Sequence, residues 1–380
     1  MRSETDAYFQ GRPLALRYVP QLDGLRAVAC ALVVFSHVVP PAARGMLDAL
    51  PWGSVGVQFF LVLSGYLVTT ILLDCRDRID DGGGQTFAFA LRQFHARRAL
   101  RVLPLYYGVL AVLVVLDYGM IRESLHWHAL CLMNFWRSAT GINFLNHLWV
   151  IAVEQQFYLA WPFLILLVPR ARRVPVILVL MAVAPVYRFS AWYLGAPFVA
   201  LNTIPLASLD TLGIGALLAL FQRESDGYRA LRHFLLRIAP WMGAAGLCAL
   251  AYGRLTGRLG GSAQGVALGS LLAPLYAALV AGAARGLGGP ARRLLEARPV
   301  RYVGIISYGV YVLHPLVMEL CLHAHAAWGM SYPRTFAFRL VLVFALSVLA
   351  ASVTWYALEK PLNALKRRFP YAARGDDTRE

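Results

Sequence analysis

The segment LDGLRAVACALVVFSHVV, residues 22–39, is almost wholly apolar yet contains one arginine and one histidine. A helix needs roughly 20 apolar residues to cross a bilayer, so this segment is predicted to span a membrane. Arg26 and His37 are 11 positions apart. At about 100° per residue both side chains share one helix face, roughly 16 Å apart along the axis. Because ionisable side chains in spans usually face a polar cavity or the bundle interior, this face is predicted to border a polar site.

The rest of the chain also has the composition of a polytopic membrane protein. Of its 380 residues, 59% are hydrophobic and 15% are charged, whereas soluble domains hold roughly 45–50% apolar and about 25% charged residues. Span length predicts an all-α fold with about ten transmembrane helices. The predicted spans are residues 22–40, 55–73, 102–117, 147–168, 174–194, 203–221, 238–253, 264–284, 302–321 and 336–358. Residues 125–135 are interpreted as a re-entrant or interfacial helix.

Arginine and lysine residues are distributed unevenly around these spans. With a cytoplasmic N-terminus, 27 of the 36 lie on the cytoplasmic side, six lie in external loops and three lie within spans. This bias predicts a multi-pass protein of the inner (cytoplasmic) cell membrane with both termini in the cytoplasm. It also accounts for the net charge of +16 without a nucleic-acid partner.

The sequence predicts a single membrane domain at residues 22–358. A cytoplasmic arm, residues 1–21, precedes it, and a basic cytoplasmic tail, residues 359–380, follows it. The motif DDGGGQ at residues 80–85 predicts a flexible loop, and no cleavable signal peptide is expected. The five cysteines are scattered, without a CxxC pair or a Cys/His cluster, so neither a disulfide framework nor a metal site is predicted.

Polar side chains interrupt other apolar segments. In NHLWVIAVEQQFYLAWP, residues 146–162, His147 and Glu154 share a helix face, with Glu154 roughly 10 Å deeper. A carboxylate at that depth must be paired, protonated or in a wet cavity. Arg98 and Arg101 lie three positions apart on a helix entering the membrane, where guanidinium groups suit phosphates. Further candidates for supporting roles are Asp23, Ser64, Tyr158, Asp210 and His314.

A structural interpretation of the same residues stands beside the functional one. Arg26 and His37 are each able to snorkel to a membrane interface, with Asp23 as the partner of Arg26. Juxtamembrane arginines are usually explained by the positive-inside bias alone. His314, which precedes Pro315, is typical of a histidine that forms hydrogen bonds at a helix kink.

Seven segments, taken in order, resemble the acyltransferase-3 family of integral membrane acyltransferases. They are LDGLRAVACALVVFSH, FFLVLSGYL, RRALRVLPLYY, HLWVIAVEQQFYLAWP, LDTLGIGALLA, SYGVYVLHPL and LEKPL, and they extend from residue 22 almost to the end of the chain. The resemblance implies transfer of an acyl group, commonly acetyl, from cytoplasmic acyl-CoA. The implied acceptor is a sugar hydroxyl of a surface or secreted glycan such as O-antigen or exopolysaccharide. Some members of the family acylate small molecules such as antibiotics instead.

Two arginine motifs of the family have counterparts here. Its Arg-x10-His pair corresponds to Arg26 and His37, and its Arg-x-x-Arg pair corresponds to Arg98 and Arg101. Some relatives carry a hydrolase-like domain after the last span, and none follows in this sequence. The membrane domain alone is therefore expected to hand the acyl group to its acceptor.

The family's His-Leu-Trp…Glu-x-Gln-Phe-Tyr stretch corresponds to residues 147–158. Family members usually carry SVEEQF in this stretch with a serine directly after the Trp, whereas here Val150 stands at the position after the Trp and Gln155 replaces the second carboxylate. Glu154 is therefore expected to be the carboxylate that matters.

Acyl transfer to a hydroxyl needs a base, a donor for the developing oxyanion and alignment of the two reactants. We predict that His37 is the catalytic base, because imidazole titrates near neutral pH. Glu154 is predicted to orient that imidazole, as the carboxylate does in a hydrolase triad. Arg26, Arg98 and Arg101 are predicted to hold the phosphates of the acyl-CoA donor, most simply acetyl-CoA, and no metal is expected.

Other routes and functions remain open at this stage. A ping-pong route would pass through acylated His37 or acylated Ser64. A glycan or solute transporter would also place ionisable groups in a helical bundle, although transporters normally show internal repeats that this sequence lacks. The acceptor sugar, whether lipid-linked, polymeric or a small metabolite, and the oligomeric state are not decided by the sequence.

Overall fold

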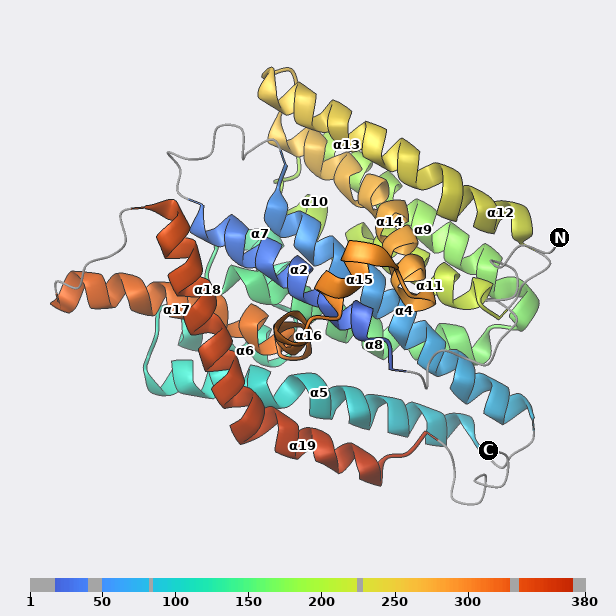
Figure 1. Ribbon diagram of the computed structural model, residues 1–380, viewed down its shortest axis with the longest axis horizontal. Helices are drawn as coiled ribbons and strands as arrows, with labels where there is room; N and C mark the ends of the chain where they lie inside the picture. Colours follow the sequence, from blue (N-terminus) through green and yellow to red (C-terminus); the bar gives the residue numbers. More distant parts are fainter. Residues whose placement is uncertain (1–17, 40–49, 82–84, 224–227, 329–334, 372–380) are drawn as a thin grey trace.

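The computed structural model describes residues 18–39, 50–81, 85–223, 228–328 and 335–371, and every regular element in these ranges is a helix (Figure 1). The ranges hold eight helices long and apolar enough to span a membrane, or nine if one bent pair counts as a span. The predicted all-α, polytopic membrane fold is confirmed. The eight helices are centred on α2 (Pro20–Val38), α4 (Trp52–Asp80), α5 (Phe87–Val115), α8 (Trp149–Leu167), α9 (Arg170–Tyr193), α13 (Ala239–Leu255), α14 (Gly261–Arg285) and α18 (Phe336–Thr354).

The other two predicted spans take less regular forms. Residues 302–321 fall in the bent pair, α16 (Arg298–Ile305) and α17 (Ser307–Trp328), whose axes meet at 76°. Residues 203–221 form η4 (Pro205–Ser208) and α11 (Leu209–Phe221), together a shorter apolar helix.

Short helices connect these spans. The segment interpreted as re-entrant or interfacial forms α6 (Ile121–Ala129) and α7 (Met133–Thr140). The others are η3 (Asn146–Leu148), α10 (Ala200–Thr203), α12 (Arg229–His233), η5 (Phe234–Ile238) and α15 (Gly289–Leu295). Of the predicted flexible loop at 80–85, residues 82–84 lie outside the described residues.

The core of the bundle is α4, which packs against α2, α8, α11 and α14. Glycines allow α4 and α11 to touch through their backbones. A Cβ atom on Gly65 would overlap the carbonyl of Leu212, and one on Gly215 would overlap the carbonyl of Val62. Small residues at helix interfaces are what allow such close approach inside a membrane. This contact fixes the position of Ser64, the residue before Gly65.

The chain end returns to the membrane domain. After α18, the chain continues through η6 (Trp355–Glu359), α19 (Lys360–Ala364) and η7 (Leu365–Arg368), and α19 and η7 pack against α5. In Figure 1 these red segments run beside the cyan α5. The first part of the predicted basic tail, residues 360–368, is therefore helical and lies on the membrane domain.

Candidate functional site

Several residues predicted from the sequence meet in one cavity of about 120 Å³, bordered by α2, α4, α5, α8 and α17. We call it the inner cavity. The predicted residues that line it are Arg26, Ser64, Arg98, Arg101, Glu154 and Tyr158. Ser307, Tyr308 and Tyr311, from the first turns after the α16–α17 bend, complete its polar lining. The fold thus brings five separate parts of the sequence to one polar space among apolar helices.

The closest polar contact in the inner cavity joins α4 to α8. The hydroxyl of Ser64 donates a 2.5 Å hydrogen bond to Oε1 of Glu154. Within the described part of the chain, Glu154 has no other hydrogen bond and no ion pair, and it lines the inner cavity. Gln155 does not line the cavity. A carboxylate held against a hydroxyl in this way is able to accept that hydroxyl's proton.

Arg98 and Arg101 lie on the α5 side of the inner cavity. The guanidinium of Arg98 lies 5.2 Å from the ring centroid of Tyr158, a cation–π contact. Arg101 donates a 3.2 Å hydrogen bond to the carbonyl of Ile305 at the end of α16, and it lies 4.0 Å from the carboxylate of Glu359. Both side chains are half-buried. Aromatic, backbone and carboxylate contacts thus hold the two side chains at the wall that the cavities share.

The contacts of Arg26 agree with both the structural and the functional interpretation of this residue. It forms a 2.9 Å ion pair with Asp23 one turn earlier in α2, as the structural interpretation expects. The Asp23 side chain is only 8% exposed, whereas that of Arg26 is 29% exposed. Arg26 also lines the inner cavity, so pairing with Asp23 does not withdraw it from the site.

A second, larger cavity of about 360 Å³ adjoins the first, because Arg98 and Arg101 line both. We call it the basic cavity. Its remaining lining residues are Ile71, Asp74, Arg78, Arg97, Lys366 and Tyr371. Four of these residues were not predicted from the sequence: Arg78, Arg97, Lys366 and Tyr371. Arg97 stands next to Arg98 in the motif FHARRALR, but only the fold shows that the chain end returns to this motif.

His37 lies outside both cavities, in a cluster of three histidines. Its ring centroid is 4.9 Å from that of His314, which is 5.7 Å from that of His147. His37 is exposed, whereas His147 and His314 are buried. Tyr311 connects this cluster to the inner cavity, because it lines the cavity and its ring centroid lies 5.9 Å from that of His314.

The contacts of the cluster assign the tautomers of its rings. Nδ1 of His314 lies 2.8 Å from the carbonyl of Tyr311 and 3.2 Å from that of Val310, so it carries the proton and donates. Its Nε2 is then an acceptor, 3.4 Å from Nδ1 of His37. Nδ1 of His37 also lies 2.9 Å from the carbonyl of Val33 and donates to it. Nε2 of His37 is left with a lone pair, the form that a general base requires.

The predicted contact between Glu154 and His37 is not formed. Among the described residues, no hydrogen bond or ion pair joins them: Glu154 accepts from Ser64, and His37 meets Val33 and His314. The expectation that Glu154 orients the imidazole therefore has no contact to support it in this structure and stays a prediction. The physical reason is that a carbonyl of the same helix, four residues earlier, already fixes the Nδ1 proton of His37.

The other predicted residues have structural contacts. The expected kink contacts of His314 are those to the two carbonyls described above. Nε2 of His147 lies 3.1 Å from the carbonyl of Val312, and the Tyr311 hydroxyl donates to the carbonyl of His147 at 2.5 Å. These contacts fasten the start of α8 to α17.

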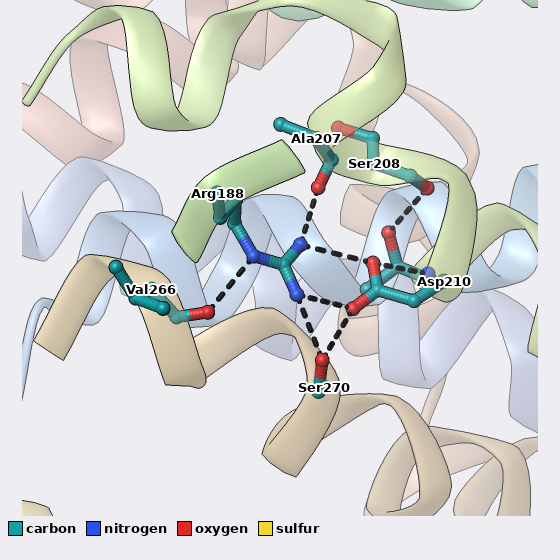
Figure 2. A network of polar contacts seen from close by, with 7 residues as sticks. Arg188, Ala207, Ser208, Asp210, Val266 and Ser270 are labelled. Atoms are coloured by element: carbon teal, nitrogen blue, oxygen red, sulfur yellow. Dashed lines mark hydrogen bonds and ion pairs between the residues drawn. The ribbon is translucent and has the colours of Figure 1, made fainter. Parts of the chain in front are cut away.

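Asp210 lies in a separate buried network, which Figure 2 shows. Nη2 of Arg188 lies 2.6 Å from Oδ2 of Asp210 and 2.7 Å from the hydroxyl of Ser270. Nη1 donates to Oδ1 of Asp210 and to the carbonyl of Ala207, and Nε donates to the carbonyl of Val266. All five N–H groups of the guanidinium are thus used. Asp210 lines neither cavity, and its contacts tie α9, α11 and α14 together.

Comparison with known proteins gives the family. The sequence profile of the acyltransferase domain family matches residues 19–356. Peptidoglycan O-acetyltransferase OatA of Listeria monocytogenes is 33% identical over 162 residues, which cover 38% of this chain and 24% of that protein. Putative peptidoglycan O-acetyltransferase YrhL of Bacillus subtilis is 34% identical over 162 residues, 38% of this chain and 23% of that protein.

A putative O-acetyltransferase of Staphylococcus aureus is 31% identical over 165 residues, 39% of this chain and 24% of that protein. The chain thus spans about a quarter of the length of these curated relatives. No solved structure matches it significantly. The family match favours the predicted acyltransferase over the transporter alternative. Because the profile covers nearly the whole chain, this protein belongs to the acyltransferase-3 family.

Proposed function

We propose that the protein is an O-acetyltransferase that moves an acetyl group from acetyl-CoA in the cytoplasm to a sugar hydroxyl of a glycan beyond the membrane. The observation that carries the proposal is the sharing of Arg98 and Arg101 by the basic cavity and the inner cavity. A donor anchored by its phosphates in the first would extend its thioester into the second. The names of the relatives, which are peptidoglycan or putative O-acetyltransferases, support a glycan acceptor.

The proposed orientation follows from the arginine and lysine bias. It puts both chain ends and the basic cavity on the cytoplasmic side of the cell membrane, and it puts His37 on the opposite side. Within the membrane the thioester is shielded from water, which limits hydrolysis of the donor. Arg98 and Arg101 hold the phosphates through charge-assisted hydrogen bonds, and Arg26 adds a third cation on the wall of the inner cavity.

His37 is the proposed base. The acceptor oxygen attacks the thioester carbonyl carbon, the C–S bond breaks, and the hydroxyl proton passes to Nε2 of His37. That proton then passes to the CoA thiolate, so that the ester and free CoA are the products. The Nδ1–H of His37, held by the Val33 carbonyl, keeps Nε2 deprotonated and aimed away from its own helix. The thioester reaches this ring past Tyr311.

A two-step route is the second candidate, and the short Ser64–Glu154 hydrogen bond favours it. In that route the Ser64 oxygen attacks the thioester carbonyl carbon while Glu154 takes the hydroxyl proton. The C–S bond breaks, and Glu154 passes that proton to the departing thiolate, so that CoA leaves as the thiol. The acyl group is then passed from Ser64 to the acceptor hydroxyl, with His37 as the base.

The test is transfer of radiolabelled acetyl from acetyl-CoA in membranes that carry the protein, together with proton NMR of acetyl groups in surface glycan with and without the gene. We expect labelled glycan from the membranes and loss of an acetyl signal on deletion. If the glycan spectrum is unchanged and the label is recovered in a small molecule, the acceptor is that small molecule and not a glycan. Failure to consume acetyl-CoA would overturn the proposed donor.

A further inference from the structure

The basic cavity has an unusual charge balance for a partly enclosed space. Five of its eight lining residues are cationic, and they come from three parts of the chain: Arg78 from α4, Arg97, Arg98 and Arg101 from α5, and Lys366 from η7. All five are half-buried. The one acidic lining residue, Asp74, forms an ion pair with Arg223. Grouping cations in a partly desolvated space is unfavourable unless an anion of several charges completes it.

The chain end is built into this cavity. One nitrogen of Arg97, Nη1, donates to the carbonyls of Lys366 at 2.9 Å and Phe369 at 3.0 Å. The same guanidinium lies 4.6 Å from the ring centroid of Tyr371. A cation bound to the last carbonyls of a helical segment stabilises its C-terminal end. Arg97 therefore fastens the segment that carries Lys366 and Tyr371 to α5.

The shape of the two cavities specifies the kind of anion. The basic cavity adjoins the inner cavity at Arg98 and Arg101. A ligand with a phosphate-rich end in the basic cavity and a long linear tail in the inner cavity would therefore fit the two cavities together. The nucleotide end of CoA carries a diphosphate and a 3′-phosphate, on the order of four negative charges at neutral pH. Tyr371 offers an aromatic ring, on which a base is able to stack.

We propose that the C-terminal segment, residues 360–371, is part of the donor site: Lys366 binds the phosphates of the CoA thioester, and Tyr371 packs against its adenine. The inference rests on the proposed function, since it adds residues to the same donor site. Phosphate groups also occur on anionic lipids, so the test separates a lipid headgroup from CoA.

The test is isothermal titration of CoA into the full chain in phosphatidylcholine nanodiscs. Lys366→Ala is expected to weaken CoA binding about tenfold. Arg368→Ala removes the same charge from the same turn, but Arg368 is exposed and does not line the cavity, so this control is expected to change binding less than about twofold. Tyr371→Leu is expected to weaken CoA binding, and Tyr371→Phe, which keeps the ring, to retain it. Gel filtration and thermal unfolding confirm that each variant is folded.

The outcomes separate the inference from the proposed function. If the wild type binds CoA and Lys366→Ala and Tyr371→Leu bind it equally well, the role of the chain end is refuted and the donor stands. If the wild type does not bind CoA, the proposed donor itself fails. A lipid-headgroup site would be detected in nanodiscs that contain phosphatidylglycerol. There the lipid would compete with CoA for the wild type, and Lys366→Ala would abolish this competition without changing CoA affinity in phosphatidylcholine nanodiscs. That result would also overturn the inference.

Discussion

Nε2 of the buried His314 lies 3.4 Å from Nδ1 of the exposed His37. The lone pair of His314 therefore faces the Nδ1 proton of His37, which the Val33 carbonyl also binds. His314 lines neither cavity, and it is interpreted as a positioning residue for the proposed base. His37→Ala is expected to lower the transfer rate by about 10²–10⁴-fold, the usual contribution of a general base. His314→Ala is expected to lower kcat by only about tenfold, because the Val33 carbonyl still holds the Nδ1 proton of His37. The KM for acetyl-CoA is expected to stay unchanged, because His314 lines neither cavity.

Steady-state kinetics in nanodiscs measures both effects. His323→Ala, at an exposed position farther along α17, is the control and should match the wild type. A raised KM with normal kcat in His314→Ala would count against a positioning role. Near-normal transfer by His37→Ala would remove His37 from the mechanism.

Substitutions at Glu154 and Ser64 separate the two routes. In the two-step route, Glu154→Gln is expected to lower kcat at least about 100-fold, since the amide is no base for the Ser64 hydroxyl. In the direct route, Ser64→Ala removes one hydrogen bond and is expected to cost about tenfold. Mass spectrometry of acid-quenched protein is the second measurement. Acetylated Ser64 in the wild type, together with complete loss of transfer in Ser64→Ala, would establish the two-step route instead.

The cations shared by the cavities are expected to act on donor affinity. Arg98→Ala and Arg101→Ala should each raise the KM for acetyl-CoA about tenfold, because each removes charge-assisted hydrogen bonds to phosphate. Arg92→Ala is the matched control, an exposed arginine of the same helix that lines neither cavity. Unchanged CoA binding in both variants would refute the phosphate assignment.

The buried pair of Arg188 and Asp210 is expected to govern stability. Asp210→Asn leaves a buried guanidinium without its counter-charge and should lower the free energy of unfolding by about 3–5 kcal/mol. Asp117→Asn breaks an exposed pair with Arg122 and should change it by less than about 1 kcal/mol. Denaturation in matched detergent checks the difference. Equal effects of the two substitutions would show that the buried network contributes nothing special.

Burial of His128 in α6 predicts a loss of stability in acid. Within the described residues neither ring nitrogen has a hydrogen-bond partner, and burial lowers the pKa of His128 to about 4. The unfolded chain, whose histidine has a pKa of about 6.5, therefore binds the proton first as pH falls. This histidine should reduce the free energy of unfolding between pH 6.5 and about 4, by on the order of 3 kcal/mol in total.

The variant His128→Leu removes this titration and should flatten the dependence of thermal unfolding on pH between 7.5 and about 4.5. His126→Leu, at an exposed position of the same helix, is the control and should leave the dependence as in the wild type. The prediction fails if both variants follow the wild-type curve.

The sequence predicted the spans well because twenty apolar residues in a row have few alternatives to a membrane helix. It also predicted several residues of the inner cavity, among them Arg26 and Glu154, since a charge in a span needs a polar environment. It could not predict the bend between α16 and α17. That break places Ser307 and Tyr308 in the lining of the inner cavity, and residue 306 itself is an isoleucine.

Two parts of the site depended on packing between distant segments. Glu154 was predicted to contact His37 by analogy with a hydrolase triad. The position of a residue along a helix does not show which neighbouring helix its side chain faces, and in the structure Glu154 accepts a hydrogen bond from Ser64 of α4. Lys366 and Tyr371 resembled an ordinary charged tail. Only the return of the chain onto α5 shows that they border a cavity.

The backbone contact between α4 and α11 restricts how such an enzyme is able to move. With Gly65 against Leu212 and Gly215 against Val62, neither helix has room to rotate or slide past the other. Ser64 is therefore expected to keep its position relative to α11. A motion that admits the two substrates is therefore expected outside the pair of α4 and α11, for example in α5 or at the 76° joint of α16 and α17.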